Sequence, residues 1–419
     1  MNNPSSKPSE SELVAGNTER RNGAYSSVRD ASSTGLTNQQ SDSEEFHFPF
    51  LDYPETVKLF NILRRNGIDA RFVGGCVRDA ILGIKSEDLD IAVRYDITHV
   101  YTILEYSGVQ CIPTGLKYGS ITVFVDGRRF ELTTLRVDRE CFGRDCVIAE
   151  SSSFEEDAKR RDFTVNALYV DMTGKLFDYF NGIQDLKNGI VRFIGDPLSR
   201  INEDYLRIFR YYRFCAVLGD LSNRYDAIIK QTAQHVSKLS IERIRKELFV
   251  MLTSKCASKI MEFAVNAGIF DSIFTKINAW RNFEMDVLAD AGNLEMKLFL
   301  LFEYDELMHK LRLTKIQKEK LKDYKKYEDE SLMYCFYKKG PDFLREMQSI
   351  RRFKYGEDEV FEVPSGESPI FPVKFEDLPA GFKNASKSLR DCEKWWVNHG
   401  FNKNKEECLE YIFTQSDEH

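Results

Sequence analysis

The sequence has few of the features that anchor a protein in a membrane, bridge it with disulfides or hold zinc. A membrane-spanning helix needs about 18 or more consecutive apolar residues, and no stretch of the 419 residues comes near that length. We therefore expect no membrane partner. The nine cysteines include no C-x-x-C pair, Cys141 and Cys146 being the closest two, and there are only six histidines. This usage favours reduced thiols over disulfides or zinc ligands.

The N-terminal segment, residues 1–46, is poor in the apolar side chains that a folded core needs. It is rich in Ser, Asn and charged residues, so it cannot bury enough surface to offset its chain entropy, and we expect a disordered extension. Its arginines are compatible with a mitochondrial transit peptide, but its glutamates argue against one, because such peptides are poor in acids. We therefore expect a cytoplasmic protein, with the mitochondrial matrix as the alternative for a eukaryotic source.

The chain has no overall excess of positive charge. Its formal net charge of −7 argues weakly against a nucleic-acid partner. The distribution differs, however, because residues 310–326 hold eight Lys and Arg against Glu319 and Asp323. A phosphate backbone senses clustered charge, so this segment, with Lys318, Lys320 and Lys322 at its centre, is our candidate RNA-binding surface.

Residues 71–93, RFVGGCVRDAILGIKSEDLDIAV, predict a strand, a Gly-Gly turn, a short helix and a second strand. Side chains two apart on a strand point to one face, so Asp88 and Asp90 can aim at the same point. An isolated Asp-x-Asp is usually a turn or a solvated strand end. Within this unit, two carboxylates with phosphate oxygens from a substrate predict a Mg²⁺ site.

The Gly-Gly turn of this unit predicts a phosphate site. Gly74 and Gly75 allow the backbone to approach a triphosphate closely, and Arg78 follows on the helix. A lone Gly-Gly is only a turn, so the combination carries the prediction.

A predicted β-hairpin adds a third acid. Residues 120–125 and 129–135 are strand-like and are joined by Asp126-Gly127, a hairpin turn sequence. Glu131 on the second strand either joins the two aspartates or is an ordinary exposed strand glutamate.

Two further clusters combine arginines with acids. Arg161, Asp162 and Asn166 occur in RRDFTVN and suit phosphate and ribose hydroxyls, although a charge pair at a helix start is the alternative. In EDYLRIFRYYR, Asp204, Arg207 and Arg210 fall near one helix face, where a surface salt-bridge ladder is the usual interpretation.

An aspartate beside an arginine can also distinguish bases. Cytosine and adenine present an amino donor next to a ring-nitrogen acceptor, whereas uracil and guanine present a carbonyl next to an N–H. Ionised Asp only accepts and Arg only donates. The Asp204-Arg207 pair therefore predicts preference for C and A, because the other edges leave buried groups unpaired.

After residue 178 helical periodicity persists to the end. We expect helix starts at Asn202, Ser240 and Thr314, a break over residues 362–379, and a final helical pair over 389–397 and 405–413. The pattern therefore predicts a mixed α/β unit with a hairpin in its sheet, followed by an all-α remainder.

Six sequence motifs in order resemble the class II tRNA nucleotidyltransferases, the CCA-adding branch of the polymerase β-like nucleotidyltransferase superfamily. They are GGCVRDAILG...DLDIAV, KYGSITV, FELTTLRVD, AKRRDFTVNALYVD, FDYFNGIQDLKNGIVRFIGD and NEDYLRIFRYYRF. SIERIRKEL at residues 240–248 fits the next helix of the family, and SLRDCEKWWVNHGF is similar to the C-terminal region of bacterial members.

This resemblance implies a head, neck, body and tail arrangement. The expected segments are the extension 1–46, an α/β head with a mixed sheet over 47–180, and an all-α neck (181–260), body (261–330) and tail (331–419). The resemblance also implies addition of C, C and A from CTP and ATP to the 3′ end of tRNA, without a template, by two-metal phosphoryl transfer. It implies that two Mg²⁺ ions act, with Asp88 and Asp90 as ligands and Glu131 as an occasional third acid. It places the phosphate and ribose contacts at Gly75, Arg78 and Arg161. It places base selection at Asp204, Arg207, Arg210 and Arg213, and the tRNA acceptor arm on the helical remainder.

Alternatives remain open at this point. A bacterial-type poly(A) polymerase shares the head and neck, and an enzyme that adds only CC or only A would share the same motifs. An RNA-binding pseudoenzyme is disfavoured because the metal and base positions are filled. The absence of any His-Asp dipeptide excludes an attached HD-type phosphohydrolase. The family often has D-G-R-H where this chain has Phe142-Gly143-Arg144-Asp145, which bears on the switch from C to A.

Overall fold

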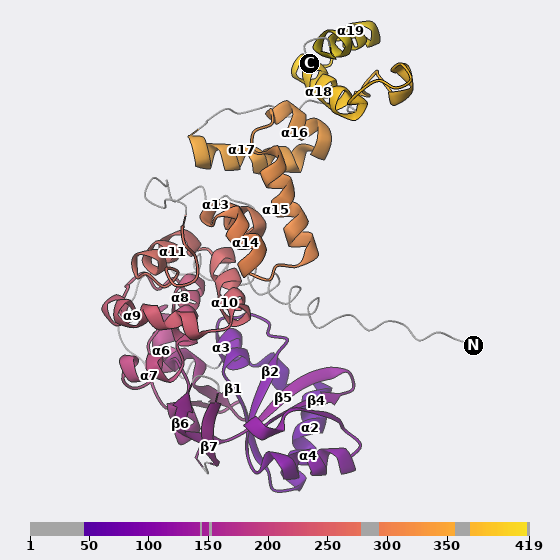
Figure 1. Cartoon of the computed structure of the whole chain (residues 1–419). Helices are drawn as coiled ribbons and strands as arrows, with labels where there is room; N and C mark the ends of the chain where they lie inside the picture. Colours follow the sequence, from indigo (N-terminus) through magenta and orange to yellow (C-terminus); the bar gives the residue numbers. More distant parts are fainter. Residues whose placement is uncertain (1–45, 143–144, 151–152, 278–292, 357–368, 417–419) are drawn as a thin grey trace, which may run out of the picture. The chain divides into compact units, whose positions relative to one another are not determined.

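The computed structural model describes residues 46–142, 145–150, 153–277, 293–356 and 369–416 (Figure 1). The chain divides into two compact units between Thr275 and Lys276. The first unit contains a mixed sheet followed by helices, and the described part of the second consists mainly of helices. The expected α/β head and helical remainder are thereby confirmed, while the division into five segments stays a prediction.

A seven-stranded sheet, of order β3-β4-β5-β2-β1-β8-β9, forms the centre of the first unit. Its strands are β1 (Asp69–Val73), β2 (Leu89–Arg94), β3 (Gln110–Gly115), β4 (Ser120–Val125), β5 (Arg128–Thr134), β8 (Leu168–Val170) and β9 (Leu176–Asp178). β2 and β5 pair in parallel, and the other neighbours pair antiparallel. β6 (Arg136–Phe142) and β7 (Asp145–Glu150) form a separate hairpin, and residues 143–144 between them lie outside the described residues.

The predicted hairpin is confirmed as β4 and β5. Asp126 and Gly127 have φ angles of 48° and 87°, the left-handed values that a two-residue turn needs to match the strand twist. Asn and Asp tolerate this region and Gly adopts it freely, which is why this dipeptide joins the strands.

Helices that the sequence predicts pack against this sheet. α2 (Pro54–Arg65) corresponds to the helix expected before the Gly-Gly turn, and its Phe60 ring stacks on Phe72 of β1 at 5.1 Å between centroids. α4 (Ile97–Tyr106) begins after Asp96, whose carboxylate accepts a hydrogen bond from the backbone N–H of His99. Between the two lies α3 (Gly75–Ile81), the short helix that follows the Gly-Gly turn.

The first unit contains further helices, most of them after the last strand of the sheet. They are η2 (Pro49–Leu51), η3 (Leu116–Tyr118), α5 (Phe154–Lys159), η4 (Thr164–Asn166), α6 (Gly182–Lys187), α7 (Pro197–Glu203), α8 (Leu206–Leu218), α9 (Asp226–Thr232), η5 (Ala233–Lys238), α10 (Ile241–Thr253) and α11 (Ala257–Asn266). The expected helix start at Ser240 is confirmed, because Ser240 immediately precedes α10.

The expected helix start at Asn202 is wrong. Asn202 lies near the end of α7, which starts earlier because Pro197 occupies its first turn and the Asp196 carboxylate accepts from the backbone N–H of Ser199 at 2.8 Å. The chain then turns extended at Asp204 and starts α8 at Leu206. Asp204 therefore sits at a joint between helices.

The second unit contains α13 (Leu294–Leu301), α14 (Tyr304–Lys310), α15 (Lys315–Tyr327), α16 (Leu332–Lys339), α17 (Pro341–Tyr355), η7 (Phe375–Asp377), α18 (Ala385–Asn398) and α19 (Lys405–Ser416). The helix start predicted at Thr314 is confirmed, because Thr314 caps α15, and Gln317 completes a reciprocal capping pair. The final helical pair is confirmed as α18 and α19, whereas residues 362–368 of the expected break lie outside the described residues. In the part of the chain that is described, no helix has the length and apolar character to cross a bilayer.

Candidate active site

Two of the three predicted acids lie on neighbouring strands, and the third lies directly before one of them. Asp90 in β2 stands directly opposite Glu131 in β5, and Asp88 immediately precedes β2. The intervening Leu89 is buried, so Asp88 and Asp90 project to the opposite, accessible face. The side chains of Asp88 and Glu131 are 41% and 42% exposed. The parallel pairing of β2 with β5 thus gathers the acids at an open position.

The positively charged side chain of Arg129 lies beside two of these carboxylates. A guanidinium nitrogen of Arg129 is 3.1 Å from Glu131 Oε2, and another is 4.0 Å from Asp88 Oδ1. No group of three or more His, Cys, Asp and Glu side chains over the described ranges forms a ready-made metal cage. One or two carboxylates completed by substrate phosphates is, however, the usual way in which proteins hold Mg²⁺, and the donor set at Asp88 and Asp90 fits it.

The Gly-Gly turn lies against two of the predicted phosphate ligands. A Cβ atom at Gly74 would be 3.5 Å from Nη1 of Arg161, and one at Gly75 would be 3.9 Å from Nη2 of Arg78. Gly74 also has φ 76°, a conformation that side chains with a Cβ rarely adopt. The turn therefore brings bare backbone beside two guanidinium groups, as a triphosphate site requires.

A buried hydrogen-bond chain connects Arg78 to the helical part of the unit. Arg78 donates to Asn166 Oδ1 at 2.6 Å, and the Asn166 amide donates to Asp162 Oδ1 at 3.0 Å. Asp162 Oδ2 accepts from Nε of Arg210 at 2.6 Å. The chain of hydrogen bonds therefore joins the predicted cluster around Asp162 to the predicted cluster that contains Arg210.

The charge of Asp162 is sustained by this chain. Its side chain is 9% exposed, and burial opposes ionisation. The guanidinium of Arg210 and the hydrogen bond from Asn166 outweigh that effect and hold the pKa of the Asp162 carboxyl well below its usual range. Asp162 is therefore a charged, fixed group at neutral pH.

Arg160 and Arg161 share one buried acid that the sequence analysis did not single out. Asp157, whose side chain is 1% exposed, accepts from Arg160 at 2.7 Å and from Arg161 at 3.0 Å. The Tyr169 hydroxyl donates to the same carboxylate at 2.7 Å. Burial raises the pKa of Asp157, but the combined effect of the two arginines and Tyr169 is larger and lowers that pKa to about 2.

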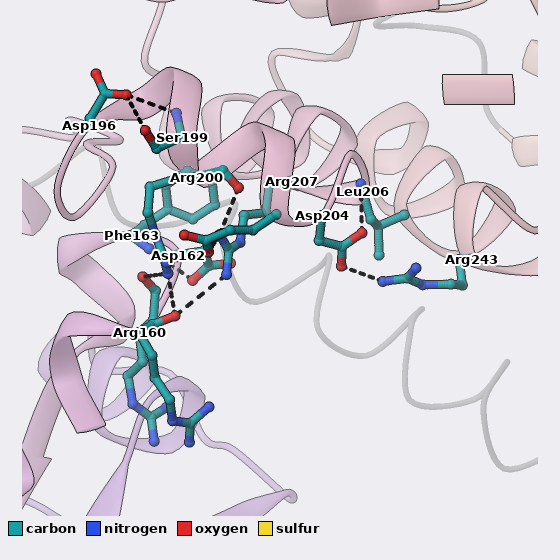
Figure 2. Close-up of polar contacts among 12 residues, drawn as sticks. Arg160, Asp162, Phe163, Asp196, Ser199, Arg200, Asp204, Leu206, Arg207 and Arg243 are labelled. Atoms are coloured by element: carbon teal, nitrogen blue, oxygen red, sulfur yellow. Dashed lines mark hydrogen bonds and ion pairs between the residues drawn. The ribbon is translucent and has the colours of Figure 1, made fainter. Parts of the chain in front are cut away.

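The Asp204 and Arg207 side chains have different partners (Figure 2). Arg207 donates to Glu203 Oε2 at 2.6 Å and to the carbonyl of Arg200 at 2.7 Å. Asp204 Oδ1 accepts from the backbone N–H of Leu206 at 3.1 Å, and its Oδ2 accepts from Arg243 at 2.5 Å. The two groups are close in sequence, but each is oriented separately.

The other two predicted base-site arginines converge on α10. Glu247 of α10 forms an ion pair with Arg213 and lies 3.8 Å from Arg210. Burial lowers the pKa of Arg213, with Glu247 opposing that shift, while the pairing with Asp162 and Glu247 outweighs burial and raises the pKa of Arg210. α10 thus supplies Arg243 opposite an acid and Glu247 opposite two arginines.

The candidate RNA-binding lysines differ from one another. Lys320 forms an ion pair with Glu346 of α17 at 2.8 Å, whereas Lys322 is exposed and Lys318 partly exposed on α15. Residues four apart share a helix face, so Lys318 and Lys322 lie together and Lys320 points elsewhere.

Sequence reasoning missed four residues of this network: Asp157, Glu203, Arg243 and Glu247. The spacing of Arg243 and Glu247, opposite charges four apart on a predicted helix, is a signal that was present. It indicated only a surface pair, because nothing in the sequence places α10 against α8.

Two family models match the chain. Residues 70–192 match the poly A polymerase head domain, and residues 221–281 match the probable RNA and SrmB-binding site of polymerase A. The chain is 28% identical to CCA tRNA nucleotidyltransferase 1, mitochondrial, of Mus musculus, over 90% of this chain and 93% of that protein. It is 37% identical to the CCA-adding enzyme of Lactobacillus helveticus over 47% of this chain and 49% of the other.

Solved structures have the same fold. The Bacillus stearothermophilus CCA-adding enzyme in complex with CTP superposes with a TM-score of 0.61 at 23% identity, covering 87% of this chain and 97% of that one. The Thermotoga maritima CCA-adding enzyme complexed with tRNA_CCA gives 0.57 at 19% identity, covering 87% and 96%. The solved structures show the shared fold, and the family models, the relatives and the six sequence motifs together show that the chain belongs to the class II tRNA nucleotidyltransferases, the family of the CCA-adding enzymes.

Proposed function

We propose that this protein adds C, C and A to the 3′ end of tRNA, using CTP and ATP and releasing pyrophosphate. The observation that carries the proposal is the buried chain from Arg78 through Asn166 and Asp162 to Arg210. It connects a candidate triphosphate site, beside the strand acids, to a helix that carries candidate base-selecting residues. An enzyme that chooses a nucleotide without a template needs both in one rigid unit.

The strand acids are proposed to hold two Mg²⁺ ions together with the triphosphate. Bound there, these ions would supply Lewis-acid activation of the tRNA 3′-hydroxyl and would neutralise charge on the phosphates. Asp88 and Asp90 would be the protein ligands, and Glu131, which faces Asp90 on the neighbouring strand, would assist them. Arg78 and Arg161 would orient the triphosphate so that the hydroxyl oxygen attacks the α-phosphorus in line and the bond to pyrophosphate breaks.

Base choice is proposed to lie at the joint between α7 and α8. Each oxygen of Asp204 accepts one hydrogen bond in the structure, and a carboxylate oxygen can accept a second, from the amino group of C or A. Arg207 retains guanidinium N–H groups for the ring-nitrogen acceptor beside it. Arg210 and Arg213 would support this site from the next turns of α8.

The helical remainder is proposed to hold the tRNA acceptor arm by its phosphates, with Lys318 and Lys322 as the better candidates on α15. Lys320 is a weaker candidate because Glu346 already pairs with it. The cytoplasm stays our expected compartment. The mouse relative is named mitochondrial, so the matrix is the alternative, which fractionation of tagged protein would decide.

The test uses tRNA lacking CCA, lacking CA and lacking A, with CTP and ATP supplied singly and together. Product length is read on a denaturing gel. Growth by the missing nucleotides in each case supports full CCA addition. Arrest after CC, or activity only on tRNA that lacks A, would replace it with a partial enzyme. Long A tails would replace it with a poly(A) polymerase.

A further inference from the structure

Arg243 holds the carboxylate that we assign to base selection. Its guanidinium is 2.5 Å from Asp204 Oδ2 and comes from α10, a helix that packs along α8. The side chains of Arg243 and Asp204 are 18% and 20% exposed, so water screens the pair only partly. The two residues are 39 positions apart in the sequence.

Asp204 is fixed from two sides. Its Oδ1 accepts from the backbone N–H of Leu206, which ties one oxygen to the start of α8, and its Oδ2 accepts from Arg243 (Figure 2). A carboxylate held at both oxygens cannot rotate about its last side-chain bond without losing a charged hydrogen bond. Without Arg243, the restraint on Asp204 that remains among the described residues is the bond from the backbone N–H of Leu206.

We propose that Arg243 is a positioning residue for nucleotide specificity, acting through Asp204. This inference rests on the proposed function. A fixed carboxylate opposes the carbonyl oxygen of uracil or guanine, whereas a mobile one can turn away and admit the wrong base. Arg243 therefore contributes to rejection of UTP and GTP more than to the rate of CTP addition.

The rest of the surroundings fits this role. Arg207 is separately held by Glu203 and by the Arg200 carbonyl, so loss of Arg243 leaves the donor half of the pair in place. Glu247, four residues along the same face of α10, pairs with Arg213 and lies near Arg210. Of these α10 contacts, the one from Arg243 reaches the acid of the candidate base site.

The experiment compares Arg243→Met with the parent enzyme on tRNA lacking CCA. Met keeps an unbranched side chain of similar length but removes the guanidinium. The ratio of kcat/KM for CTP to kcat/KM for UTP is measured, with kcat and KM resolved for each nucleotide. We expect the ratio to fall about tenfold or more, because one fixed charged acceptor distinguishes the two base edges. Lys246→Met, an exposed residue on the same helix, is the matched control and should keep the parent ratio.

A merely structural role would slow CTP and UTP addition equally, so a ratio within about twofold of the parent overturns the inference. If Arg243→Met does not fold, as judged by circular dichroism, Arg243→Lys carries the test. Lysine keeps the charge but lacks the planar fork, so a ratio lowered about threefold supports the inference and an unchanged ratio overturns it. A parent enzyme that does not extend tRNA would reject the proposed function itself, which separates that failure from this one.

Discussion

The strand acids of the first unit and the buried chain from Arg78 to Arg210 differ in how far their charges are already compensated. Asp88 and Glu131 are about two-fifths exposed and share Arg129 as a cationic neighbour. Asp162, in contrast, is buried and bonded to both Asn166 and Arg210. One region is open to incoming ligands, and the other is complete without them.

This difference fits two separate tasks. A site that gathers metal ions and phosphates gains its binding energy when they arrive, so its acids stay accessible. A site that discriminates between bases loses specificity if its groups move, so its side chains are held in advance. Substitutions in the two regions should therefore separate activity from stability, and the following predictions test that separation.

The largest expected effect is on activity alone. Asp90→Ala should reduce nucleotide addition roughly thousandfold or more, because it removes a proposed ligand of the metal ions that stabilise the developing charge. The thermal midpoint should stay within about 2 °C of the parent, since a partly exposed side chain without a core role contributes little to folding. Gel-based extension assays and thermal melts measure the two quantities. Glu105→Gln on α4 is the control, and substantial activity in Asp90→Ala would remove the metal assignment.

The second prediction concerns the free energy of unfolding, which a substitution in the buried chain should lower. Asp162→Asn removes the buried carboxylate that pairs with Arg210, whose side chain is 32% exposed, so water screens the loss in part. We expect a cost of about 2–3 kcal/mol, below the about 3–5 kcal/mol of a fully buried pair. Urea denaturation of both proteins measures the loss. The matched control is Asp69→Asn, which breaks the exposed pair with Arg94 and should cost less than about 1 kcal/mol. Equal losses for the two substitutions would contradict the contrast drawn between buried and open charges.

The third effect depends on pH. The pKa of Asp157 is lowered in the folded protein to about 2 from an ordinary 3.8, so the unfolded chain takes up this proton first as pH falls. The stabilisation from its ionised form is therefore present above about pH 4 and is lost as pH falls toward 2. Asp157→Asn should be less stable than the parent by about 2 kcal/mol at pH 7, and the difference should narrow below pH 4. Urea midpoints at pH 7 and pH 3.5 test this, and a constant difference would contradict the assigned ionisation.

Local signals explain what the sequence predicted correctly. The Gly-Gly turn, the Asp-x-Asp strand and the Asp126-Gly127 hairpin each depend on a few adjacent residues, and the structure contains all of them. The register that sets Asp90 opposite Glu131 follows from strand pairing, which the sequence suggested without fixing. Confirming that these acids act together requires the activity measurements above.

The residues that the sequence did not predict have charge partners that lie outside their own helix. The predicted Asp204-Arg207 pair assumed one continuous helix, whereas Pro197 and Asp196 start α7 early and leave Asp204 in the joint before α8. Arg243 and Glu247 could not be assigned because their partners depend on how α10 packs against α8. Long-range ion pairs of this kind become visible only once the fold is known.

The smallest expected effect extends the contrast to the second unit. The double substitution Lys318→Gln and Lys322→Gln should weaken tRNA binding and make its salt dependence shallower by roughly one to two in log-log slope, because each lost phosphate contact lowers the number of counterions released. Lys320→Gln should change the slope less, since Glu346 already compensates that charge. Filter binding across a series of salt concentrations gives both slopes. An unchanged slope in the double variant would move the RNA to another surface, and a larger change for Lys320→Gln would show that the ion pair with Glu346 opens when tRNA binds.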